Sequence, residues 1–195
     1  MPAPPLPAGA ASVVVAQRSL PTNYLLGYYS GPTATSPDYQ ALRIATAVLT
    51  GRLFAELRTK QNLTYDVHAP FLDRAVSAGG LYISTVSPDK SLQLMRAGID
   101  ELQRELLDPA GLERLSQQFI TEYFLDNETN AAQADFLARS QLYRGDFRLA
   151  ERFMDEIRRV TPEDVQRVAR KYMIGFRFAY VGDARRLNSA LVNRF

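Results

Sequence analysis

The pattern of hydrophobic and polar positions changes its period within one stretch, Gly51–Phe71 (GRLFAELRTKQNLTYDVHAPF). Up to Lys60 the apolar residues recur at helical spacing, and from Leu63 apolar and polar residues alternate with a period of two. Two polar residues, Gln61 and Asn62, separate the two patterns. The stretch therefore predicts a helix that leads into a strand. One face of this strand is expected to carry Leu63, Tyr65, Val67, Ala69 and Phe71, and the other Thr64, Asp66 and His68.

The rest of the chain predicts further strands and helices. Strands are expected at residues 13–17, 23–30, 77–87 and 176–181. Helices are expected at residues 38–50, 91–106, 109–126, 131–143, 147–160, 162–175 and 184–191. Asp89 is expected to cap the second of these helices, and Leu106 to be the last residue of its core-facing stripe. The clearest cap is Thr161, which is followed by a proline and two acids.

The order of these elements defines the predicted fold class. Hairpins alternate with runs of helices, and the strand at 77–87 is expected to pair antiparallel with residues 65–71. This order favours an α+β fold, a two-layer sandwich whose mostly antiparallel sheet carries its helices on one face. Residues 1–12 (MPAPPLPAGAAS) are predicted to be a linker and residues 13–195 one domain. A chain that begins in a linker is expected to be a fragment of a longer subunit.

Composition narrows the classes of protein that fit. The 195 residues are 46% hydrophobic and 23% charged, as in folded globular proteins. The net charge of +2 comes from scattered residues, which argues against nucleic-acid binding. The chain has no cysteine, so disulfides and cysteine zinc sites are excluded, and no apolar run reaches the ~20 residues of a membrane span. The composition does not indicate whether the parent protein lies in the periplasm or in the cytoplasm of a bacterium.

The motifs that would make this chain a catalyst are missing. Its only histidine is His68, and it contains no H-x-x-E-H, H-E-x-x-H, G-x-S-x-G or G-x-G-x-x-G sequence. We therefore expect no metal site, no cofactor and no catalytic residues in this chain, which alone should be inactive.

Arg58 and Tyr65 are the strongest candidates for function. They lie seven positions apart on either side of the predicted helix–strand junction, where a cation and a phenol can converge. In a purely structural interpretation, Arg58 pairs with nearby acids on the surface and Tyr65 packs in the sheet. In a functional interpretation, both groups donate hydrogen bonds to a carbonyl or its developing oxyanion.

The run LFAELRTKQNLTYDV resembles a signature of the insulinase/pitrilysin-type (inverzincin) zinc metallopeptidases, which include the mitochondrial processing peptidases. It is most similar to their metal-free C-terminal domain, which reads roughly S-R-L-F-x-x-L-R-E-K-x-x-L-x-Y-x-V. The matching positions are Arg52, Leu53, Phe54, Leu57, Arg58, Lys60, Leu63, Tyr65 and Val67. The sequence departs from the family in the short segment Val48–Gly51, where a longer Gly-rich segment is usual. It also carries Asp66 where a small residue is more frequent.

The resemblance implies a fold, a partner and a role. Members pair two similar α+β domains in each subunit, and two such units enclose a chamber. It implies that zinc lies in a partner domain or subunit of the same family, and that Arg58 and Tyr65 hold the peptide substrate and polarise its scissile carbonyl. This chain would then be the non-catalytic substrate-binding domain of a bacterial zinc protease. Two alternatives stay open: a non-proteolytic scaffold subunit of the same fold, and an unrelated α+β interaction module.

Overall fold

The computed structural model describes residues 10–195, and residues 1–9 of the predicted linker lie outside this range. Six strands form one sheet: β1 (Ser12–Gln17), β2 (Asn23–Thr33), β3 (Thr64–His68), β4 (Phe71–Leu72), β5 (Val76–Thr85) and β6 (Arg177–Gly182). Their order is β1-β6-β2-β5-β3, with β4 also paired to β5. Only the pairing of β1 with β6 is parallel among these described strands.

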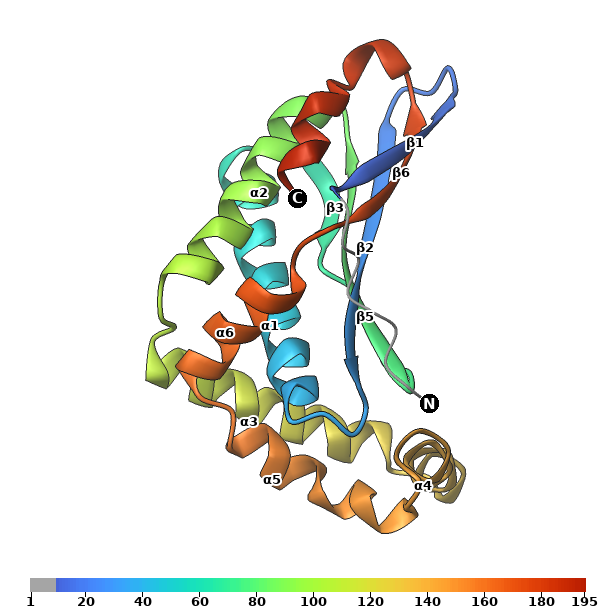
Figure 1. Ribbon diagram of the computed structural model, residues 1–195, viewed down its shortest axis with the longest axis vertical. Helices are drawn as coiled ribbons and strands as arrows, with labels where there is room; N and C mark the ends of the chain where they lie inside the picture. Colours follow the sequence, from blue (N-terminus) through green and yellow to red (C-terminus); the bar gives the residue numbers. More distant parts are fainter. Residues whose placement is uncertain (1–9) are drawn as a thin grey trace.

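The long helices lie on one side of this sheet. Helices α1 (Asp38–Leu53), α2 (Pro88–Arg104) and α6 (Pro162–Tyr172) cover one face, and in the described part of the chain the other face carries no helix (Figure 1). Helices α3 (Pro109–Asp126), α4 (Asn130–Arg144) and α5 (Phe153–Arg158) gather at one end (Figure 1). The predicted two-layer α+β fold is therefore confirmed. No helix within residues 10–195 combines the length and the apolar character that crossing a membrane requires.

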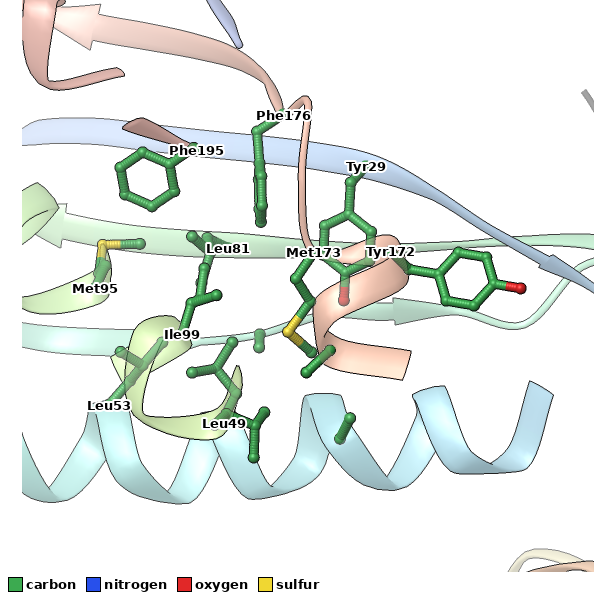
Figure 2. Close-up of a cluster of buried hydrophobic side chains, with 14 of the residues drawn as sticks. Tyr29, Leu49, Leu53, Leu81, Met95, Ile99, Tyr172, Met173, Phe176 and Phe195 are labelled. Carbon is green, nitrogen blue, oxygen red and sulfur yellow. The ribbon is translucent and has the colours of Figure 1, made fainter. Parts of the chain in front are cut away.

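The core lies between the sheet and its three covering helices. Figure 2 shows Tyr29 and Leu81 of the sheet meeting Leu49 of α1 and Ile99 of α2. Alternation along β2 explains this, because Leu25, Gly27 and Tyr29 are buried while Leu26 and Tyr28 are only partly buried. Gly79 faces Tyr29 across the strand pair, and a Cβ there would lie 2.1 Å from the Tyr29 hydroxyl oxygen. The Tyr29 ring therefore packs directly over Gly79, which explains why this position of β5 carries a glycine.

Several predicted boundaries were wrong, each for a local reason. The first helix does not end near Gly51 but continues into a π-helix, Phe54–Lys60, because this glycine has ordinary helical geometry. Helix α2 begins at Pro88 with Ser87 as its N-cap, not with Asp89, and it ends before Leu106, which is 54% exposed.

Two further predicted helices, at residues 147–160 and 184–191, are divided into shorter segments. Residues 147–160 form a 3-10 helix, Phe147–Arg152, followed by the short α5. The predicted last helix is two 3-10 segments, Ala184–Arg186 and Ser189–Arg194. By contrast, Thr161 forms the predicted capping box with Asp164 at the start of α6.

A buried carboxylate joins the first helix to α6. Asp38 begins α1, and its side chain is only 6% exposed. It accepts hydrogen bonds from Arg167, from Lys171 at 2.8 Å and from the Tyr172 hydroxyl at 2.8 Å. Burial opposes the charge, but these donors outweigh it and lower the pKa of Asp38 from 3.8 to about 2. The ionised carboxylate therefore stabilises the contact between the two helices.

This network predicts a stability that depends on pH. Because the pKa is lower in the folded state, the contribution is complete above about pH 5 and is lost as the pH falls toward 2. Replacing Asp38 by Asn should cost about 1–2 kcal/mol at pH 7, since the half-exposed cations are partly screened. In urea unfolding, the deficit should shrink between pH 5 and pH 2, whereas exposed Asp126→Asn should leave stability unchanged. A deficit that stays constant over this range would contradict the account.

Candidate functional site

The helical half of the site is a π-helix at the end of α1. Residues Phe54–Lys60 adopt this wider turn, and the Gln61 N–H donates to the Glu56 carbonyl, five residues back, at 3.0 Å. Leu57 points into the core and is fully buried, which anchors the turn. Asn62 then takes a left-handed conformation with φ of 50°, which ends the helix as the sequence predicted. Arg58 is thereby held on the outer side of a firmly packed turn.

The strand half of the site contains a β-bulge. Thr64 pairs with Thr85 and Val67 pairs with Ile83, so Tyr65 and Asp66 together face the single residue between those partners. The Thr64 hydroxyl holds the bulge, because it donates to the Ser84 carbonyl at 2.6 Å and accepts from the Asp66 N–H at 3.0 Å. Thr64 and Val67 are both buried although they lie three positions apart.

The predicted face of Tyr65 was wrong because of this bulge. Strict alternation placed Tyr65 beside Val67 on one face and Thr64 on the other. In the structure Thr64 and Val67 share the buried face, and Tyr65 is 82% exposed. The extra residue shifts the alternation by one step, so the phenol stands outside the core.

Arg58 and Tyr65 meet at the junction. The Arg58 guanidinium carbon lies 4.9 Å from the Tyr65 ring centroid and 4.8 Å from the ring centroid of Phe54. Cation–π contacts with two rings hold the side chain in place. Among residues 10–195 no carboxylate lies within 4.0 Å of this guanidinium, and no protein hydrogen bond involves it or the Tyr65 hydroxyl. The purely structural interpretation, an Arg58 ion pair and a packed Tyr65, therefore does not describe the observed geometry.

An open hollow adjoins this pair. Its volume is about 590 Å³, and Tyr24 and Tyr82 line it from the strand face opposite the core. Its floor comes from the outward residues of β2 and β5, including Tyr24 and Tyr82. The residues that line it are Thr22, Tyr24, Arg58, Asn62, Leu63, Thr64, Tyr65, Asp66, Tyr82, Ser84, Thr85 and Val86.

A second polar group lies next to the pair. Asp66 Oδ1 lies 3.2 Å from Nδ1 of His68, whose ring is tilted against that of Tyr82 with centroids 5.0 Å apart. Burial, followed by the nearby charges of Asp66 and Tyr24, raises the pKa of Tyr82. His68 thus lies on the polar open face, where the strand pattern placed it. In the range that the structure describes, no three His, Asp or Glu side chains are close enough to hold a metal ion.

Sequence reasoning found the pair but missed its neighbours. Phe54 matched the family signature, and its position four residues before Arg58 in the predicted helix was a signal for their contact that sequence reasoning did not use. The alternation along the predicted strands could have placed Tyr24 and Tyr82 on the outward face of the sheet. Their proximity to Tyr65 could not be predicted, because it depends on the bulge.

The comparison with protein families identifies the class. The sequence pattern of the family described as Peptidase M16 inactive domain matches residues 1–119. The chain therefore belongs to this family of inactive peptidase domains, as the resemblance to the insulinase-type metallopeptidases implied. No curated protein matches the chain by sequence.

Solved structures share the fold. The peptidase M16 inactive domain from Pseudomonas fluorescens is 20% identical with a TM-score of 0.79, over 94% of this chain and 47% of that chain. The inactive peptidase domain of a proposed zinc protease from Bordetella parapertussis is 23% identical with a TM-score of 0.74, over 85% and 92%. A chain of complex III2 from Candida albicans is 16% identical with a TM-score of 0.80, over 94% and 48%. This chain spans about half the length of the Pseudomonas and Candida chains.

The bulge predicts the effect of removing one hydroxyl. Thr64→Val keeps the shape of the side chain but loses the bonds to Ser84 and Asp66, so it should cost about 1–2 kcal/mol. Hydrogen exchange should show the Asp66 amide losing protection. As the control, Thr121→Val removes a hydroxyl bonded to Gln117 on an exposed part of α3 and should have little effect. Unchanged protection at Asp66 would mean that Thr64 does not hold the bulge.

Proposed function

We propose that this chain is the substrate-binding domain of a zinc-dependent protease whose metal site lies in a partner domain or subunit of the same family. The observation that carries the proposal is the pairing of Arg58 with Tyr65 at the rim of an open hollow, with neither group bonded to a protein acceptor within residues 10–195. Membership of an inactive peptidase family supports it.

The chemistry follows from what the two side chains can donate. A guanidinium stacked between two rings keeps the N–H groups at its edge available, and the exposed phenol offers one O–H. Both groups are positioned before a ligand arrives, so they can stabilise negative charge on a carbonyl oxygen without reorganisation. In the proposed function they hold the peptide and polarise the carbonyl that is attacked, while the partner domain supplies the zinc.

Two alternatives are separated from this proposal by different observations. The fold and the family match both argue against an unrelated interaction module. A non-proteolytic scaffold subunit has the same fold, and the likeness to a chain of complex III2 bears on fold alone. Only activity distinguishes it from a protease domain.

The decisive experiment removes each donor in the presence of the zinc-bearing partner. Tyr65→Phe and Arg58→Ala should each lower peptide turnover by about 10²-fold, as loss of an oxyanion donor does. Arg58→Lys should recover only part of the loss, because an ammonium lacks the planar fork of a guanidinium.

Matched control variants remove a tyrosine hydroxyl and an arginine guanidinium at positions outside the hollow. Tyr143→Phe on α4 and Arg114→Ala on α3 should leave turnover at the wild-type level. Wild-type rates in Tyr65→Phe and Arg58→Ala would contradict the proposal. Complete absence of peptide hydrolysis by the reconstituted protein would favour the scaffold alternative.

A further inference from the structure

The hollow beside Arg58 and Tyr65 is lined by one anionic and one cationic side chain, and these two side chains do not pair with each other. Among its lining residues only Asp66 and Arg58 carry charge. Arg58 contacts the rings of Phe54 and Tyr65, which leave its N–H groups available, and no salt bridge joins it to Asp66 in the described part of the chain. The hollow therefore presents two separate charged points to a ligand.

Asp66 has an oxygen free for a ligand. The bulge places its side chain outside the core, and that side chain is 53% exposed. Oδ1 contacts His68 at 3.2 Å, while Oδ2 has no hydrogen-bond partner among residues 10–195. The carboxylate lines the same hollow as Tyr82, a residue of its floor.

The walls around this carboxylate are aromatic. Tyr24, Tyr65 and Tyr82 line the same hollow, and the first two are 42% and 82% exposed. Phenol rings attract cations through their faces and also pack against methylene groups. A carboxylate bordered by three phenols suits a side chain with an apolar stem and a positive end.

We propose that this hollow is a subsite for a basic side chain, lysine or arginine, of the bound peptide, with Asp66 as its charge partner. The inference rests on the proposed function, since it assumes that a peptide lies against Arg58 and Tyr65. A purely apolar side chain fits less well, because it would cover the free Asp66 oxygen without giving it a donor. An acidic side chain would be repelled by the same carboxylate, and Arg58, which could attract it, binds the peptide carbonyl in the proposed function.

The test compares peptides that differ only in charge. A series carrying a single arginine, moved one position at a time around the cleaved bond, is matched by peptides with citrulline at the same positions. With the zinc-bearing partner present, kcat/KM should favour arginine about fivefold to tenfold at one position, as a partly exposed ion pair with a cation–π contact allows. In Asp66→Asn this ratio should fall to about one.

Control variants separate this inference from the proposed function. Glu113→Gln removes an exposed carboxylate on α3 and should keep the wild-type ratio. Arg58→Ala and Tyr65→Phe should slow arginine and citrulline peptides alike, and if they do not, the proposed function fails whatever the ratio. A wild-type protein with no preference at any position, or an Asp66→Asn variant that keeps the preference, would overturn the subsite.

Discussion

One extra residue in strand β3 determines where the site faces. A regular strand would put Tyr65 on the same side as Val67, inside the core. The bulge at Tyr65 and Asp66 shifts the alternation, so the phenol and the carboxylate both lie outside while Thr64 and Val67 stay buried. Bulges are known to re-aim side chains next to functional sites. Without this shift, Arg58 would have no exposed phenol beside it.

The two halves of the site are anchored in the same core. Leu57 anchors the π-helical turn and Val67 anchors the strand, and both belong to the core that joins the sheet to its helices. Arg58 and Tyr65 are therefore carried by packed elements and not by a loose loop. An arrangement fixed before binding is what stabilisation of developing charge requires. In the described part of the chain the long helices all lie on the other side of the sheet (Figure 1).

Much of this architecture could be predicted because it follows from burial. The change from a helical to a strand period at Gln61 marked the junction correctly, since each pattern keeps apolar residues toward the core. The capping box at Thr161 was equally visible, because its chemistry is local. The bulge was not visible, since the sequence from Leu63 to Phe71 fits simple alternation. The bond from Thr64 to Ser84, a residue 20 positions away, helps to fix the actual register, and no local pattern in the sequence indicates it.

The most direct test of this account is a crystal structure of the chain with the proposed zinc-bearing partner and an uncleaved peptide. The account predicts one peptide carbonyl oxygen within about 3 Å of both the Tyr65 hydroxyl and an Arg58 nitrogen, a distance typical of oxyanion donors. A peptide bound elsewhere, with these two groups facing only solvent, would contradict it.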